Sequence, residues 1–207
     1  MVTHLAGLRP GPKPLCTRGY VSSETVSFAR HLGARPYQTC PPQQVATADA
    51  ARLLAGGPVT LAGSVLEPGE LRRAWTDIYA WVHASWSPVA PAFEEPALAG
   101  FTDDLDLTHT RVVATPTIRA AAFIFHDNPY PVVVAECRTP HEPAGRDLLR
   151  ACVRDALVSL ADDGVISASF DGHDSDPHFR PLLDELPTTG ERFELLEWTP
   201  PATEHPH

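Results

Sequence analysis

The sequence predicts a mixed α/β protein, and three observations lead to this fold class. Apolar residues recur with helical spacing from Leu71 to Val82 and again from Leu148 to Leu160. Apolar runs of strand length, bounded by Pro, Gly, Asp and Asn, lie before, between and after these two segments. Of the 207 residues, 43% are hydrophobic and 20% are charged, so the chain can bury a core of its own.

The N-terminal 58 residues are expected to form an extension. Residues 1–19 are rich in Pro and Gly, which favours an extended arm. A short helix is expected next, capped by Ser22 or Ser23 and ended by Gly33. The extension then continues with a strand at 35–38, a helix at 47–54 and a linker at 56–58.

A strand at 59–65 is expected to lead into a long amphipathic helix that opens at 67–70. Trp81 and Trp86 widen the apolar stripe of this helix. Such aromatic residues pack in cores more often than they line ligand sites, so we expect core packing, with a ligand-facing wall as the alternative. The stripe itself consists of Leu71, Trp75, Ile78 and Val82, at i, i+4, i+7 and i+11.

The remaining pattern alternates strands and helices. The run 132–135 is apolar at every position, as expected for a central strand covered on both faces. A helix begins near Arg146 and is ended by Gly164. The expected strands are 110–114, 118–125, 130–137, 165–170 and 192–198, with a short helix at 178–186 and a tail at 200–207.

Charge and hydropathy exclude several classes of partner. There are 16 Lys and Arg against 26 Asp and Glu, and the formal charge of -10 opposes sequence-independent binding of nucleic acid or of anionic membranes. No run approaches about 18 apolar residues, so no membrane span is expected. The N-terminus does not look like a signal peptide, and we expect a cytoplasmic protein.

No metal site is expected. The four cysteines show neither a C-x-x-C pair nor zinc-like spacing, which indicates buried or free thiols. The loop 171–178 offers carboxylate and imidazole groups but lacks a recognised calcium or zinc pattern. We interpret it as a polar turn in which Asp176 caps the helix that follows.

Two stretches, together with the order of elements from Val59 onward, resemble the GNAT superfamily of acyl-CoA-dependent acyltransferases. The first is 131–149, a central strand, loop and helix placed where that family binds pyrophosphate. The second is 176–186, placed where the family has a polar residue before its last helix. The resemblance covers about residues 59–198 and implies a mostly antiparallel twisted sheet flanked by helices.

The resemblance implies that acetyl-CoA or another acyl-CoA binds at the loop before the second helix. A helix N-terminus binds phosphate through its free N–H groups, although Pro140 and Pro143 each remove one donor here. Glu142 would oppose a phosphate if it pointed inward. The expected cofactor-binding residues are Cys137, Arg138, His141, Ala144, Gly145, Arg146 and Asp176.

For catalysis, the resemblance implies that Glu136, at the end of the central strand, is the general base, because family members often use a Glu on or beside this strand. A surface or salt-bridged carboxylate is the alternative for Glu136. The Tyr that often protonates the leaving thiolate is replaced by Leu183, so the proton would come from water, His173, His178 or Cys137.

Residues 22–37 resemble the last helix and following strand of a second GNAT copy, with a coincidental amphipathic helix as the alternative. We therefore predict an extension at 1–58 that is the remnant of a truncated repeat, a GNAT-like domain at 59–199, and a flexible tail at 200–207. An incomplete repeat needs a surface that covers its apolar side, which is consistent with a homodimer.

The expected activity is transfer of an acyl group from acyl-CoA, or from a carrier-protein thioester, to a small amine in bacterial specialised metabolism. Two alternatives stay open. One is a catalytically silent GNAT-like module that binds a ligand or partner, indicated by the missing Tyr and the two prolines. The other is a different reaction of a thioester, such as a decarboxylation or a condensation.

Overall fold

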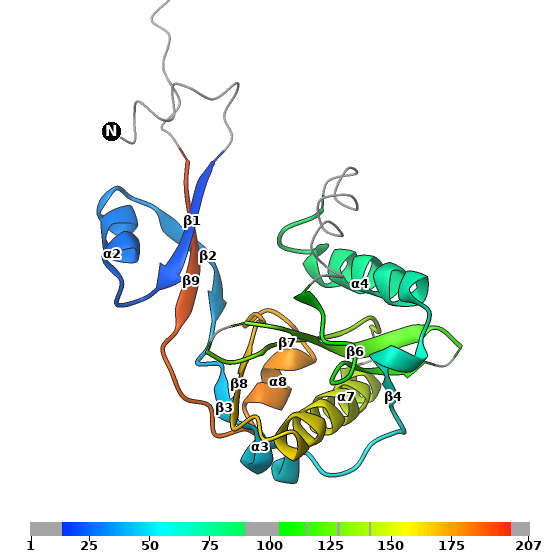
Figure 1. The fold of residues 1–207 in the computed structure, drawn as a ribbon. Helices are drawn as coiled ribbons and strands as arrows, with labels where there is room; N and C mark the ends of the chain where they lie inside the picture. The colour runs from blue at the N-terminus through cyan, green and yellow to red at the C-terminus, as the bar shows by residue number, and fades with distance from the viewer. Residues whose placement is uncertain (1–13, 90–103, 115, 128, 141, 200–207) are drawn as a thin grey trace, which may run out of the picture. The chain divides into compact units, whose positions relative to one another are not determined.

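A computed structural model describes residues 14–89, 104–114, 116–127, 129–140 and 142–199. The contacts divide the chain into two units. Unit 1 comprises the chain up to Pro42 together with the segment from Glu191 onward, and unit 2 is Gln43–Gly190. Figure 1 shows the elements of both. None of the described helices is long and apolar enough to cross a membrane.

Within its described residues, unit 1 is a three-stranded antiparallel sheet with one helix. The strands are β1 (Leu15–Tyr20), β2 (Arg35–Cys40) and β9 (Phe193–Trp198), in the order β1-β9-β2, so the C-terminal strand lies between two N-terminal ones. The helix α2 (Glu24–His31) starts where the Ser23 hydroxyl accepts the Val26 N–H, as predicted. It ends at Gly33, whose φ of +87° favours glycine.

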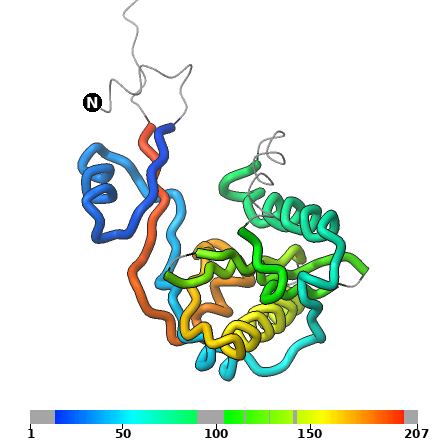
Figure 2. The backbone as a smooth tube through the Cα atoms, in the orientation of Figure 1, coloured from blue at the N-terminus to red at the C-terminus, as the bar shows by residue number. Residues whose placement is uncertain are grey.

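Unit 2 is built on a six-stranded sheet in the order β3-β8-β7-β6-β5-β4. Every neighbouring pair is antiparallel except β7 and β8, which run parallel. The strands are β3 (Gln44–Ala46), β4 (Leu61–Ala62), β5 (Arg111–Ala114), β6 (Ile118–Phe125), β7 (Val132–Cys137) and β8 (Ser167–Phe170). Figure 2 shows the early segment of β3 lying beside the late strand β8.

Helices cover both faces of this sheet (Figure 1). On one face, α4 (Pro68–His83) packs its stripe against alternate residues of β6 and β7, including Phe123 and Val134. On the other, α7 (Glu142–Asp162) and α3 (Thr47–Leu53) enclose the larger core, which contains Val133 and Ala135. A further helix, α8 (Phe179–Leu183), closes the end of that core. The central strand β7 is therefore covered on both sides, as its apolar run predicts.

Most predicted elements are present, and the differences have local causes. The strand expected at 59–65 is reduced to Leu61–Ala62, because a 3-10 turn follows at Gly63–Val65. The helix expected from Arg146 already begins at Glu142, since Pro143 lies in the first turn, where its missing N–H costs no intrahelical bond. The predicted arm at 1–19 contains β1, and β3 was not predicted.

The boundaries between the two units also differ from the domain boundaries predicted at residues 58 and 199. Residues 43–58, which include β3 and α3, belong to unit 2, and β9 belongs to unit 1. The linker signal at Gly56 and Gly57 marks a turn inside unit 2, where both residues have positive φ. Whether unit 1 descends from a truncated repeat stays a prediction.

Candidate functional site at the opening between two strands

The parallel pairing of β7 and β8 covers only the first part of β7. Val132 pairs with Ser169 and Val133 with Phe170, after which β8 ends and β7 continues to Cys137. The backbone of Val134–Cys137 thus has no strand neighbour on its β8 side among the described residues. We call this place, where β7 continues past the end of β8 at the start of α7, the opening between β7 and β8; a strand edge without a neighbour can bind an extended ligand.

Glu136 lies at this end of β7 and faces α4, opposite Ala121 of β6. Its side chain is buried, and no described residue hydrogen-bonds its Oε2. Burial, reinforced by Asp176 and Asp171, raises the pKa of Glu136 to about 8. The alternative of a surface or salt-bridged carboxylate is therefore not what the structure shows. A buried carboxyl oxygen without a partner is costly, and such groups are common where a ligand or substrate arrives.

The first turn of α7 lies beside His178, which begins the segment leading into α8. A Cβ added to Gly145 would lie 2.6 Å from Nδ1 and 2.7 Å from Nε2 of His178, so only glycine allows this contact. The Nε2 of His178 donates to the carbonyl of Thr139 over 2.7 Å, which leaves Nδ1 as an acceptor in the neutral ring. That Nδ1 is buried and has no partner among the described residues.

Asp176 holds the segment that carries His178. Its Oδ1 accepts the backbone N–H groups of His178 and Phe179 at 2.7 and 2.8 Å, as the predicted capping role requires. Its pKa is raised because burial outweighs these hydrogen bonds. Asp176 thus positions His178 and lies close enough to Glu136 to influence the pKa of that residue.

A cluster of rings from the end of α4 was not predicted as part of a site. The His83 ring lies 4.7 Å from Trp86 and 5.6 Å from His173 between ring centroids, and Trp81 lies nearly parallel to His178 at 6.3 Å. The sequence signal was present in Trp81 and Trp86, which belong to the aromatic stripe whose alternative interpretation was a ligand-facing wall. His83 gave no signal, because a lone histidine in a helix has no pattern.

Burial lowers the pKa of both His83 and His173 to about 4. Both rings are therefore neutral at pH 7. His173, a predicted proton donor, therefore has no imidazolium proton to donate at pH 7, and its low pKa also makes it a weak base. His173 and His178 thus lie beside the rings at the end of α4.

Other predicted site residues lie further from this cluster. Arg138 turns toward α4 and pairs with Asp77 over 2.8 Å. Cys137 is buried on the α7 face, opposite to Glu136, and burial raises the pKa of its thiol to about 12. Ala144 is exposed in the first turn of α7, and His141 lies outside the described residues.

The start of α7 fits a phosphate group in part. The Nε of Arg146 is buried and without a partner in the described part of the chain, so this guanidinium can donate to an anion. The first-turn N–H groups add to it, except at Pro143, which has none. No group of three or more metal-ligating side chains occurs among the described residues.

No protein-family model and no curated protein matches the sequence. Solved structures do resemble the fold. A GCN5-related N-acetyltransferase from Sphaerobacter thermophilus is 12% identical with a TM-score of 0.63, and the match covers 96% of this chain and 64% of that one.

Two further structures are similar. A protein from Enterococcus faecalis V583, described as a probable N-acyltransferase, is 11% identical with a TM-score of 0.56, over 89% of this chain and 45% of that one. A protein of unknown function from Staphylococcus epidermidis ATCC 12228 is 10% identical with a TM-score of 0.52, over 90% and 71%. The chain thus spans less than two thirds of the length of the first and second of these three structures. At such identities the likeness concerns the fold, and the fold of this chain is that of the GCN5-related N-acetyltransferases, as the sequence resemblance implied.

Proposed function

We propose that this chain is an acyltransferase that moves an acyl group from acyl-CoA, or from a carrier-protein thioester, to a small amine. The observation that carries the proposal is Glu136, a buried carboxyl group with an unpartnered oxygen, beside the opening between β7 and β8. A general base needs a pKa near the working pH and a free lone pair directed at the reacting group. The pKa of about 8 meets the first requirement.

Different groups around the opening would bind different parts of the cofactor. Bound acyl-CoA would supply an activated thioester. The guanidinium of Arg146 and the first-turn N–H groups of α7 would hold its phosphates. The β8 side of Val134–Cys137, which has no strand neighbour among the described residues, suits an extended amide-bearing arm such as pantetheine, because strand edges bind extended amides through their N–H and C=O groups.

Glu136 would take the proton from the acceptor amine. Because the carboxyl group is protonated at pH 6 and ionised above about pH 8, turnover is expected to rise across this range. The Nδ1 of His178 is an acceptor in the tautomer that donates to Thr139, so it can orient an N–H or O–H group of a substrate.

The proposal is tested by thiol release from acetyl-CoA with a panel of small amines. Glu136→Gln is expected to lower turnover by about 10² or more, the range of acid-base groups. The matched control is Asp162→Asn, an exposed carboxylate near the end of α7. Equal turnover in wild type and Glu136→Gln would remove Glu136 from the role of base.

A catalytically silent ligand-binding module is the second candidate. It is favoured by the His178 ring, which packs onto Gly145 at the turn where phosphate would bind, and by Pro143, which removes a donor there. Turnover on any amine would exclude it. Saturable CoA binding without turnover on amines that bind would support it instead.

A further inference from the structure

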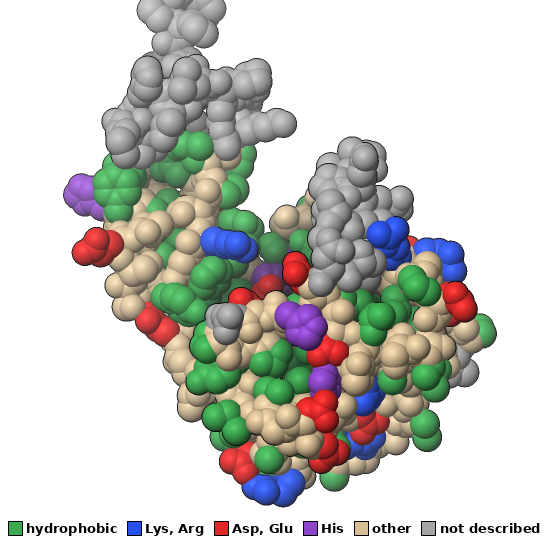
Figure 3. Space-filling view, viewed as in Figure 1, with side chains coloured by type: hydrophobic (Ala, Val, Ile, Leu, Met, Phe, Trp, Pro, Cys, Tyr) green, Lys and Arg blue, Asp and Glu red, His purple; other side chains and the backbone are tan. Residues whose placement is uncertain are grey.

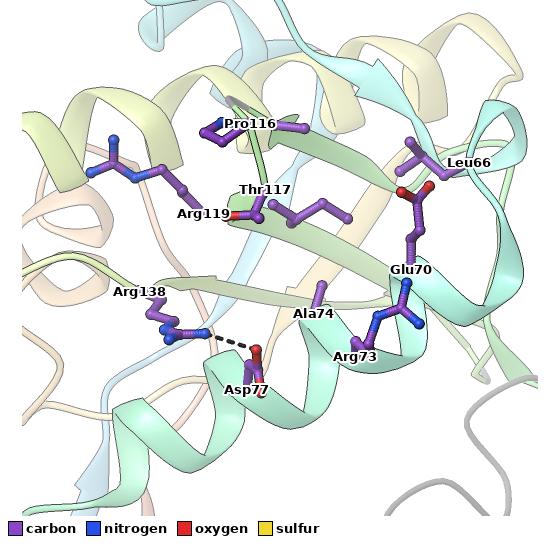
Figure 4. Close-up of a pocket in the computed structure, with 11 residues that line it drawn as sticks. Leu66, Glu70, Arg73, Ala74, Asp77, Pro116, Thr117, Arg119 and Arg138 are labelled. Carbon is purple, nitrogen blue, oxygen red and sulfur yellow. Dashed lines mark hydrogen bonds and ion pairs between the residues drawn. The ribbon is translucent and has the colours of Figure 1, made fainter.

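A second hollow lies on the α4 face of unit 2, apart from the opening between β7 and β8. Its volume is about 690 Å³, and neither Glu136, Arg146 nor His178 lines it. It is bounded by the first half of α4, the end of β5, the start of β6 and the residue after β7. Figure 4 shows Asp77 of the helix directed at Arg138, Arg73 beside Glu70, and Arg119 extending away from the helix.

Three arginines line this hollow, which we call the arginine groove: Arg73 from α4, Arg119 from β6 and Arg138 after β7. Arg119 and Arg138 are cross-strand neighbours, since the backbone N–H of Arg138 donates to the carbonyl of Arg119 over 2.8 Å. Like charges at such positions repel each other. The arrangement is notable in a chain with a formal charge of -10.

The acidic residues of the groove neutralise only part of this charge. Asp77 pairs with Arg138 over 2.8 Å. Glu70 accepts the N–H of Glu67 in the capping box of α4. Arg119 donates to the hydroxyl of Thr139 over 3.3 Å, and within the described residues neither Arg73 nor Arg119 forms an ion pair.

The floor of the groove is apolar. Ala74 of α4 is buried, and Leu66 and Ile118 pack partly against the core beneath the helix. A ligand that is only charged would leave this floor in contact with water.

On the face of unit 2 seen in Figure 3, acidic and apolar side chains are scattered and basic ones occur in small groups.

We infer that the arginine groove binds an organic anion, a carboxylate or phosphate group carried on a flat apolar body. Figure 4 shows the guanidinium groups of Arg73 and Arg119 at opposite sides of the groove. One of them would bind the anionic group through the paired donors that arginine presents to carboxylate and phosphate oxygens, and the other would attract it at longer range. Leu66, Ala74 and Ile118 would contact the apolar body. Arg138, which the sequence resemblance placed at the cofactor site, lines this groove, but Glu136 and Arg146 do not, so the inference does not rest on acyl transfer.

Phenyl phosphate and benzoate are the probes, titrated into the full chain with detection of arginine side-chain Nε–Hε signals by NMR. Both are expected to bind saturably and to shift the signals of Arg73, Arg119 and Arg138. Inorganic phosphate, which lacks the apolar body, and benzyl alcohol, which lacks the charge, are expected to bind at least about fivefold more weakly. Equal binding of inorganic phosphate and phenyl phosphate would overturn the assignment.

Variants test both signs of the charge. Arg73→Gln and Arg119→Gln are each expected to weaken phenyl phosphate binding about two- to fivefold, the range of exposed charge pairs. Asp77→Asn, which frees Arg138, is expected to strengthen it by a similar factor. The matched control is Arg72→Gln, on the same helix but not lining the groove. If Arg72→Gln weakens binding as much as Arg73→Gln, the attraction is general and the site is refuted.

A last arm separates this site from the proposed cofactor site. Phenyl phosphate binding is measured with and without saturating CoA. Independent binding supports a separate anion site, and it does so whether or not the protein transfers acyl groups. Displacement of phenyl phosphate by CoA would show that the groove belongs to the cofactor site and would overturn the inference.

Discussion

Glu136 is a buried carboxyl residue whose ionised form is disfavoured by its surroundings. Its carboxyl group is removed from water at the end of the central strand, and its Oε2 has no partner in the described chain. The sequence predicted its place on β7, because strand and helix periodicity were clear on both sides. It did not predict the burial, which depends on α4 and on the loop that carries Asp171 and Asp176.

The raised pKa of Glu136 predicts how stability depends on pH. The folded protein keeps the proton up to about pH 8, whereas the unfolded chain releases it near its ordinary pKa of 4.5. The contribution of Glu136 to the free energy of unfolding therefore falls as pH rises from about 4.5 to 8, and it falls no further above pH 8.

The side chain cannot ionise in Glu136→Gln, so this fall in the free energy of unfolding is not expected in that variant. Its stability relative to wild type should rise from pH 5 to pH 8.5, by on the order of a few kcal/mol. Thermal unfolding at the two pH values measures the effect, with Asp162→Asn as control. A constant difference between Glu136→Gln and wild type would show that the carboxyl group is not desolvated.

At the scale of elements, the long periodic segments were predicted correctly, as were short ones such as β2, α3 and β8, whereas β1 and β3 were not predicted. All four residues predicted for the stripe of α4 pack against the sheet, because apolar positions repeat over three turns. β1 and β3 were missed, since neither shows a clear alternation within so few residues and both depend on distant partners. β3 is held by pairing with β8, more than 100 residues later.

Replacement by alanine is expected to have opposite effects on stability at Gly145, which contacts His178, and at Gly69, which does not. Gly145→Ala is expected to destabilise the protein by about 1–3 kcal/mol, because the new methyl group would overlap the His178 ring. In Gly69→Ala the nearest atom lies 3.8 Å away, so stability is expected to stay unchanged or rise by up to about 1 kcal/mol.

Urea unfolding of both variants measures this difference. An unchanged midpoint in Gly145→Ala would mean that the His178 ring does not pack on the first turn of α7. Restoration of stability in Gly145→Ala/His178→Ala, relative to His178→Ala alone, would identify the ring as the source of the overlap.

At the scale of the whole chain, sequence order and structural units do not coincide. The boundary predicted at 58 followed the strongest Gly and Pro signal, yet the contacts place residues 43–58 in unit 2. Val45, Ala50 and Leu54 from this stretch are buried in the larger core. A pairing of chain ends, such as β9 between β1 and β2, leaves no local pattern from which it could be predicted.

Two fragments distinguish the predicted domain from the observed unit. Residues 43–190 retain both cores of unit 2 and are expected to unfold cooperatively. Residues 59–199 lack three buried core side chains and are expected to be several kcal/mol less stable or unfolded. Circular dichroism during heating compares them. Equal stability would show that β3 and α3 are not part of the core.

The most direct test of the central claim is a titration of CoA into the full chain, followed by backbone NMR. The account predicts saturable binding, with shifts at Val134–Cys137 and in the first turn of α7, and weaker binding by Arg146→Gln than by wild type. No binding to the folded protein at millimolar CoA, or shifts confined to other elements, would contradict the claim that this opening binds acyl-CoA.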